Sequence, residues 1–128
     1  MTIKLNHTIV NVKSKRESAK FFTELFGLPP AKPFGGYFLT VEVANGVTLD
    51  FCDADYDPEP QHYAFLVSER EFDQIFGRIK ERGIDYWADP AKKEKGKINH
   101  HDGGRGVYFE DPSGHFLEII TRPYGSGK

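Results

Sequence analysis

Several features that assign proteins to special classes are missing from this sequence. There is one cysteine, Cys52, so an internal disulfide is excluded and the reducing cytoplasm is the expected compartment. No apolar run reaches the length of about 18 residues that a membrane span needs, and the first residues lack the apolar core of a signal peptide. A formal net charge of −2 offers no large basic surface for nucleic acid. We therefore expect neither membrane nor nucleic acid as a partner.

The composition that remains is that of a globular domain. The chain has 128 residues, of which 38% are hydrophobic and 14% aromatic, and it contains 11 phenylalanines. This length is sufficient to bury a core, and the apolar content argues against disorder. We expect a single domain over residues 1–128.

The first half of the chain predicts a strand, a helix and further strands. Residues 3–12 alternate between polar and apolar in the manner of a strand. Ser14 and Glu17 match a capping box, and Gly27 is a natural end for the helix that follows. The pair Asn45-Gly46 is a strong hairpin signal between strands expected at 37–43 and 47–52.

The second half begins with the same order of elements. His62–Val67 predicts a strand that opens on a histidine. Ser68 and Glu71 form a second capping box, and Gly83 ends the second predicted helix.

The remainder of the second half leads to a hairpin. A strand is expected at 84–88, followed by a loop at 92–97 whose lysines we expect to be solvated. Residues 106–121 are two strand-forming runs around Asp-Pro-Ser-Gly, which favours a turn because proline presets φ and glycine accepts positive φ. The tail from Gly125 is expected to be frayed.

Corresponding positions in the two halves are separated by regular offsets. His7 and His62 open the two first strands and lie 55 residues apart (62 − 7). Asp50 and Glu118 fall at the same place in the two terminal hairpins, 68 residues apart (118 − 50). The larger offset is explained by the longer loop within residues 89–104. The sequence therefore contains an internal repeat of two similar halves.

We predict an α+β fold of two repeated modules, residues 1–56 and 60–124. Each module would bury its helix on one sheet face and leave the other face uncovered. Pairing the modules about a pseudo-twofold axis would create a cupped, mostly antiparallel sheet lined by alternate strand residues. By the repeat, two histidines and a carboxylate would face into this cup. Imidazole and carboxylate groups in such a cluster can bind a divalent metal ion.

The motifs resemble those of the vicinal oxygen chelate superfamily, which includes glyoxalase I, extradiol dioxygenases, fosfomycin resistance proteins and bleomycin-binding proteins. The resemblance covers nearly the whole chain, from Leu5-Asn-His7 through Glu24-Leu-Phe-Gly-Leu28 to Tyr108-Phe-Glu-Asp-Pro-Ser-Gly-His-Phe-Leu-Glu118. It implies two βαβββ modules and a homodimer, and in many short members the cup is completed across that dimer. These motifs are specific for the fold and much less specific for the reaction.

The resemblance also implies a metal site formed by His7, His62 and Glu118, which stand at the ligand positions of the family. Such a set with open coordination positions suits one divalent ion per site, Fe²⁺, Mn²⁺, Ni²⁺ or Zn²⁺. The alternative is that both histidines are packed core residues and Glu118 is an exposed strand residue. Asp50 would be a fourth ligand, as in glyoxalase I, or else a residue of the substrate pocket.

Three further side chains are candidates for catalysis. Tyr108 lies ten residues before Glu118 on the neighbouring strand, where related dioxygenases place a tyrosine on the substrate; its alternative is a cross-strand core aromatic. His100 and His101 lie in a glycine-rich loop and are candidates for an acid–base group, or else are solvated. His115 has the opposite strand parity to Glu118 and is expected to be structural.

Two classes of function fit these residues. The first is a metal-dependent enzyme acting on a small substrate that chelates the ion through neighbouring oxygens. Within this class the ligand set and Tyr108 favour dioxygenase-like chemistry over lyase, isomerase or thiol-transfer chemistry, and Ile9 stands where fosfomycin resistance proteins carry a threonine. The second class is a metal-free protein that binds a small molecule or antibiotic, as bleomycin resistance proteins do. The presence of all three ligand residues counts against the second class.

Overall fold

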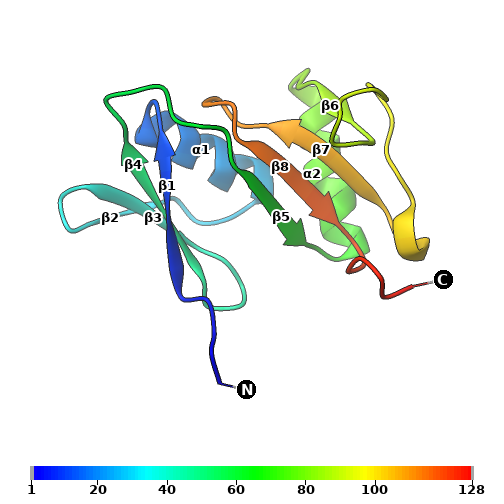
Figure 1. Ribbon diagram of the computed structural model, residues 1–128, viewed down its shortest axis with the longest axis horizontal. Helices are drawn as coiled ribbons and strands as arrows, with labels where there is room; N and C mark the ends of the chain where they lie inside the picture. Colours follow the sequence, from blue (N-terminus) through cyan, green and yellow to red (C-terminus); the bar gives the residue numbers. More distant parts are fainter. Residues whose placement is uncertain (1, 128) are drawn as a thin grey trace. The chain divides into compact units, whose positions relative to one another are not determined.

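The computed structural model describes residues 2–127, and the chain divides into two compact units, one ending at Glu59 and one beginning at Pro60. Each unit contains a strand, a helix and three further strands in that order (Figure 1). The predicted α+β fold of two βαβββ modules is confirmed. Neither helix in the described part of the chain is long and apolar enough to cross a membrane.

The first unit is a four-stranded sheet with one helix. Its sheet order is β1-β4-β3-β2, with β1 parallel to β4 and the other pairs antiparallel. The elements are β1 (His7–Val12), α1 (Lys15–Phe26), β2 (Lys32–Phe34), β3 (Phe38–Glu42) and β4 (Thr48–Asp53).

Two strand predictions in this unit needed correction. The first strand begins at His7 and not at residue 3, because the paired stretch of its parallel neighbour β4 begins at Thr48, opposite His7. The short strand β2 was not predicted. It contains Pro33, which lacks a backbone N–H, and β2 tolerates it because it is the edge strand of the sheet.

Helix α1 begins and ends as the sequence predicts. The Ser14 hydroxyl accepts a hydrogen bond from the backbone N–H of Glu17 at 3.2 Å, and Gly27 ends the helix with φ of +71°. The buried side of the helix carries Phe22 and Leu25. Burial of side chains of this size stabilises a fold by about 1.5–3 kcal/mol each.

The hairpin between β3 and β4 confirms the Asn45-Gly46 signal. The backbone N–H of Gly46 donates to the carbonyl of Val43 at 3.1 Å, and Gly46 has φ of +79°. The two strands pair antiparallel on either side of this turn.

The second unit repeats the topology of the first. Its sheet order is β5-β8-β7-β6, with β5 parallel to β8. The strand predicted at 84–88 is reduced to two residues, while the final hairpin forms as expected. The elements are β5 (His62–Leu66), α2 (Glu69–Glu81), β6 (Tyr86–Trp87), the 3₁₀ helix η1 (His101–Gly103), β7 (Gly106–Glu110) and β8 (Phe116–Ile120).

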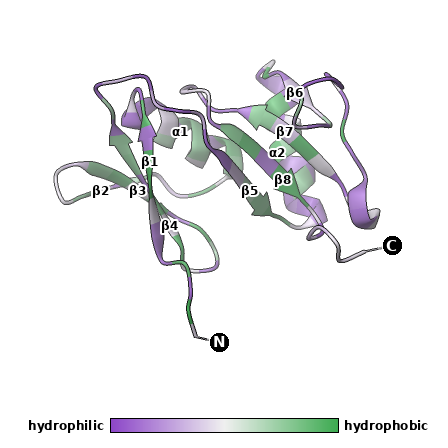
Figure 2. Ribbon diagram, in the orientation of Figure 1, coloured by the Kyte–Doolittle hydropathy of each residue, from purple (hydrophilic) through white to green (hydrophobic). Residues whose placement is uncertain are grey.

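Helix α2 lies across one face of this sheet (Figure 1). Ser68 and Glu71 form the complete capping box predicted from the sequence. Both helices carry hydrophilic and hydrophobic residues (Figure 2). The buried residues of α2 and of the sheet form the core of the unit. They are Phe72, Ile75, Ile79, Val107, Phe109, Leu117 and Ile119.

The turn between β7 and β8 is held by a buried aspartate. One carboxylate oxygen of Asp111 accepts hydrogen bonds from the backbone N–H groups of Ser113, at 3.0 Å, and His115, at 2.7 Å. Gly114 completes the turn with φ of +92°. The ring of His115 is buried, and its Nδ1 accepts from the backbone N–H of Gln61 at 3.0 Å, so the structural role expected for His115 is confirmed.

The strand registers place Asp50 and Glu118 at equivalent positions, as the repeat predicts. Each lies on the strand that comes last in the sequence of its unit, β4 or β8. In the sheet it is flanked by one residue of the parallel neighbour and one of the antiparallel neighbour. The neighbours are Ile9 and Thr40 for Asp50, and Ala64 and Tyr108 for Glu118.

Candidate metal centre

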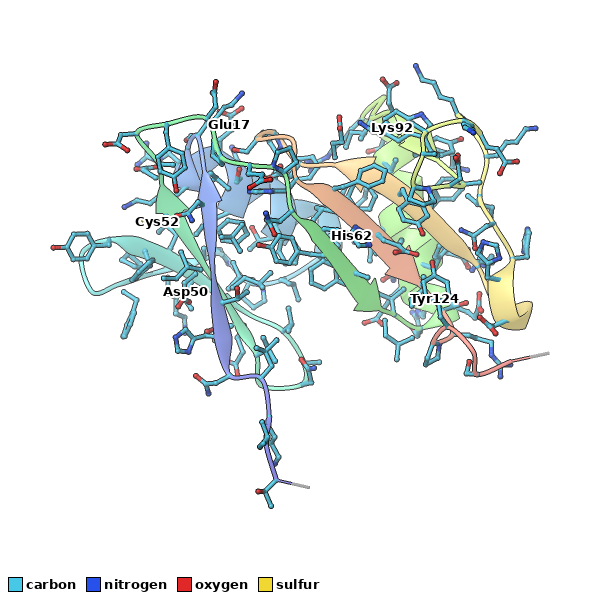
Figure 3. All side chains as sticks on the ribbon, in the orientation of Figure 1. Glu17, Asp50, Cys52, His62, Lys92 and Tyr124 are labelled. Atoms are coloured by element: carbon cyan, nitrogen blue, oxygen red, sulfur yellow. The ribbon has the colours of Figure 1, made fainter. Side chains whose placement is uncertain are left out.

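The second unit brings His62 and Glu118 into contact on the sheet face opposite the buried Leu117 and Ile119. The His62 Nε2 atom lies 3.0 Å from Oε1 of Glu118. The His62 side chain is about half exposed (47%), whereas the Glu118 side chain is almost fully buried (1%). Figure 3 labels His62 on β5. One partner of this pair is therefore accessible from solvent while the other is enclosed.

The backbone fixes the orientation of the His62 ring. Its Nδ1 atom lies 2.9 Å from the carbonyl oxygen of Phe116. A carbonyl oxygen can only accept, so Nδ1 carries a hydrogen and donates it. In a neutral imidazole the other nitrogen, Nε2, then has no hydrogen and points its lone pair at Glu118. Two acceptors in contact require a proton or a cation between them.

Two tyrosines complete the surroundings of Glu118. The Tyr124 hydroxyl donates to Oε2 of Glu118, and the Tyr108 hydroxyl lies 3.1 Å from that of Tyr124. Burial raises the pKa of the Tyr108 phenol; the hydrogen bond shared with Tyr124 opposes this shift and the charge of Glu118 reinforces it. Burial also raises the pKa of Tyr124, as does its hydrogen bond to Glu118. Both phenols therefore keep their protons at neutral pH and can act as donors.

The C-terminal tail is bonded to the rest of the unit, so the prediction that it frays from Gly125 is wrong for the residues that the structure describes. The two carboxylate oxygens of Asp102 accept from the backbone N–H groups of Gly125, at 3.1 Å, and Gly127, at 3.2 Å. Lys128 lies outside the described residues. The tail carries Tyr124, which the sequence analysis did not identify. The one available signal was an aromatic residue directly after a proline in a glycine-rich tail.

An aromatic cluster flanks the His62–Glu118 pair. The Tyr108 ring stacks on Phe116 at 5.3 Å and lies 5.9 Å from the ring of His62, and Trp87 lies 6.1 Å from Phe116. The ammonium group of Lys92 lies 5.1 Å from the Trp87 ring centre.

The Lys92 side chain is exposed, as expected for a lysine of this loop, and it also has specific partners. Its ammonium group is bonded to Glu110 and lies over two aromatic rings, those of Trp87 and Phe116, where cation–π attraction favours it. The side chain remains 43% exposed.

The two loop histidines differ in their surroundings. Both are exposed. His101 begins the 3₁₀ helix η1, and its ring lies edge-on to Tyr124 at 6.1 Å. Among the described contacts, a ring contact with this site belongs to His101 and not to His100. A role in acid–base chemistry stays a prediction for both histidines.

His7 and Asp50 belong to the first unit. His7 is exposed on β1, and its Nδ1 lies 2.7 Å from Oδ1 of Asn6. Asp50 is buried (7% exposed) and accepts a hydrogen bond from the Thr40 hydroxyl at 3.1 Å. Over residues 2–127, no group of three or more His, Cys, Asp or Glu side chains is assembled that could by itself hold a metal ion. The structure thus brings together two of the three predicted ligands, and His7 stays a prediction.

Comparison with known proteins identifies the family. The model of the Glyoxalase/Bleomycin resistance protein/Dioxygenase superfamily matches residues 4–119. The chain belongs to this superfamily. Membership confirms the resemblance to the vicinal oxygen chelate proteins and agrees with the paired βαβββ units.

Individual known proteins are similar over 90–100% of the chain. The solved structure of oxidase ChaP-H2 is 58% identical, covers 100% of both chains and gives a TM-score of 0.96. Oxidase ChaP-H1 is 56% identical, covers 97% of this chain and 99% of its own, and gives a TM-score of 0.94. The glutathione transferase FosA of Serratia marcescens is 33% identical over 121 residues, which are 90% of this chain and 78% of that protein.

Proposed function

We propose that the protein is a divalent-metal-dependent oxidative enzyme whose small substrate binds the ion through two neighbouring oxygens. His7, His62 and Glu118 are the proposed ligands, and Tyr108 is the proposed substrate-contacting residue. The proposal rests on the donor chemistry around His62, on the aromatic surface beside it, and on the similarity to two oxidases.

The orientation of His62 is the observation that carries the proposal. Its Nδ1–H is held by the Phe116 carbonyl, and its Nε2 faces the carboxylate of Glu118 at 3.0 Å. Metal-binding histidines characteristically donate their second ring nitrogen to a carbonyl or carboxylate, which fixes the ring and raises its basicity. A buried carboxylate also needs a compensating positive charge. These two residues therefore fit a divalent transition metal.

A bound ion of this kind would polarise the oxygens of the substrate and stabilise negative charge that develops on them. The protein's own residues have separate tasks. The Phe116 carbonyl orients His62, and Tyr108 presents a protonated phenol beside the pair. The half-buried ring of Phe116, which stacks with Tyr108, provides an apolar face against which an unsaturated substrate can pack.

The similarity to known enzymes favours oxidation over the other chemistries of the superfamily. ChaP-H1 and ChaP-H2 are named oxidases, and their identity of 56–58% over nearly the whole chain exceeds the 33% identity of the FosA glutathione transferase. We therefore propose dioxygen as the oxidant and Fe²⁺ as the first ion to test, with Mn²⁺, Ni²⁺ and Zn²⁺ as alternatives.

An oxygen-consumption assay tests this function. The protein purified without chelator is reloaded with Fe²⁺ under anaerobic conditions, and oxygen uptake is followed with catechol and substituted catechols. We expect uptake that depends on both protein and Fe²⁺. Consumption of glutathione without oxygen uptake would support thiol transfer instead. Tight binding of bleomycin by a protein that binds no ion would support the metal-free class.

The ligand assignment predicts the result of a matched pair of substitutions on one hairpin. Glu118→Gln removes the buried carboxylate, whereas Glu110→Gln alters an exposed carboxylate bonded to Lys92. We expect Glu118→Gln to weaken ion binding by more than the ~10–100-fold typical of a change outside the ligand set. Glu110→Gln should leave affinity unchanged. Competition with a chromophoric chelator measures both, and equal affinity of the two variants would remove Glu118 from the ligand set.

A further inference from the structure

Both oxygens of the Glu118 carboxylate are engaged, and by different partners. Oε1 lies 3.0 Å from His62 Nε2, and Oε2 accepts from the Tyr124 hydroxyl. One carboxylate oxygen, Oε1, therefore faces His62 and the proposed ion, and the other, Oε2, is bonded to a neutral phenol. Tyr124 itself is 52% exposed, whereas the Glu118 that it contacts is only 1% exposed.

The backbone around Tyr124 is fixed by a clasp of hydrogen bonds, which we define as residues 122–127. Its central turn is closed by the backbone N–H of Ser126, which donates to the carbonyl of Pro123 at 3.1 Å. Its end is hydrogen-bonded to Asp102, whose carboxylate accepts from the backbone N–H groups of Gly125 and Gly127. Figure 3 labels Tyr124 in the stretch that leaves β8 toward the C-terminus. The phenol therefore reaches Glu118 from a segment outside the sheet.

We propose that Tyr124 is a positioning residue for Glu118, held in place by the clasp and Asp102. By occupying Oε2, its hydroxyl leaves Oε1 as the oxygen directed toward His62, so the carboxylate would offer an ion one oxygen in one orientation. This inference rests on the proposed function, because it assigns Glu118 as a ligand. It gives the C-terminal tail a specific role at the site.

The substitution Tyr124→Phe isolates the hydroxyl, because it keeps the ring and removes only the hydrogen bond to Glu118. Outer-shell partners of metal ligands are typically worth ~10–100-fold in affinity. We expect a weakening of Zn²⁺ and Mn²⁺ binding in this range, measured by chelator competition. The matched control is Tyr56→Phe, which alters an exposed tyrosine of the other unit (59% exposed) and should leave affinity unchanged. Asp102→Asn should weaken binding in the same direction and by less.

A spectroscopic readout separates positioning from general loosening of the fold. When Oε2 is released, Glu118 can contact the ion through both oxygens, which raises the coordination number. The visible absorption of the Co²⁺-loaded protein should then be weaker in Tyr124→Phe than in wild type and unchanged in Tyr56→Phe. The urea midpoint of the metal-free Tyr124→Phe protein should stay close to that of wild type.

The outcomes distinguish this inference from the function on which it rests. A wild-type protein that binds neither Zn²⁺, Mn²⁺ nor Co²⁺ overturns the proposed function together with the role of Tyr124. A wild-type protein that binds an ion, with a Tyr124→Phe variant of equal affinity and identical Co²⁺ spectrum, overturns the role of Tyr124 alone. Weakened binding with an unchanged Co²⁺ spectrum also overturns it, because the carboxylate would then keep its orientation without the phenol.

Discussion

At the scale of single residues, two buried carboxylates on one hairpin have different partners. Asp111 accepts from the backbone N–H groups of Ser113 and His115, which are fixed by the turn itself. Glu118 contacts the side chains of His62 and Tyr124. Because both of these donors are backbone N–H groups of the turn, the role of Asp111 is to stabilise the turn. Side-chain partners such as an imidazole can rearrange around an ion, so Glu118 is suited to a functional role.

This contrast predicts opposite effects for the two carboxylates. Asp111→Ala leaves two backbone N–H groups of a buried turn without their acceptor, and hydrogen bonds to charged groups contribute about 1.5–3 kcal/mol each. For the two bonds together we expect a loss of unfolding free energy of about 3–6 kcal/mol, measured by urea denaturation. Asp111→Asn keeps an oxygen acceptor and should lose less. A stability of Asp111→Ala equal to wild type would show that solvent replaces the carboxylate.

Residue-scale features were predictable where they follow strand parity and the repeat. The repeat indicated His62 and Glu118, and the family resemblance indicated Tyr108. The structure brings these three together. Tyr124 was missed because its segment has no periodicity, and only the turn at Pro123 and the bonds to Asp102 bring it back to β8.

At the scale of elements, helix α2 is joined to the start of β7 by Arg105. The guanidinium group donates to Glu69 at 2.8 Å and to Asp73 at 2.8 Å, and it lies 4.4 Å from the ring centre of Phe72. Arg105 therefore ties the first turn of the helix to the sheet that carries Glu118. This contact could not be read from the sequence, because the helix and strand residues are more than thirty positions apart.

The contact predicts a pH-dependent contribution to stability. Hydrogen bonds from the Thr121 hydroxyl and from Arg105 lower the pKa of Glu69 from its ordinary value of 4.5. A carboxylate whose pKa is lowered in the folded state stabilises that state above its unfolded pKa, and the contribution is lost as the pH falls. We expect Glu69→Gln to be less stable than wild type at pH 7, with a difference that begins to shrink near pH 4.5 and is lost as the pH falls through the lowered folded-state pKa of Glu69.

Urea midpoints across the acid range measure this difference. Glu59→Gln serves as the control, because Glu59 is an exposed residue outside the helix. A difference between Glu69→Gln and wild type that stays constant from pH 7 to the acid range would contradict the prediction, since it would mean that the ionised carboxylate is not its source.

Element prediction succeeded where the signal is local. Both Ser-x-x-Glu segments start helices, and Asn45-Gly46 and Asp-Pro-Ser-Gly form turns. It failed where pairing decides the outcome. Ile3 and Leu5 alternate like strand residues but remain 87% and 68% exposed, because the strand partner β4 begins opposite His7. The edge strand β2 contains a proline and has only three residues, too few for a periodic signal.

At the scale of the whole molecule, the repeat relates the sequence of one unit to that of the other, and the proposed ligands come from both units. The second unit alone supplies His62, Glu118, Tyr108 and Tyr124. His7, the third ligand that the family resemblance implies, belongs to the first unit. The resemblance also implies a homodimer in which the first unit of one chain serves the second unit of its partner. The homodimer and the shared site stay predictions, because the sequence of one chain does not encode quaternary structure as a local pattern.

Mixing two defective variants decides which chain provides His7. His7→Ala and Glu118→Gln should each bind ions weakly when pure, because every site lacks one ligand. In a dimer with shared sites, a mixed pair has one site with both defects and one with none. Equal mixing and subunit exchange should then restore about a quarter of the wild-type sites. Ion stoichiometry by chelator competition, on a species whose mass is set by light scattering, measures this. No recovery in a dimer that does exchange subunits would place all ligands within one chain, because each chain would then carry its own defect into every mixed pair.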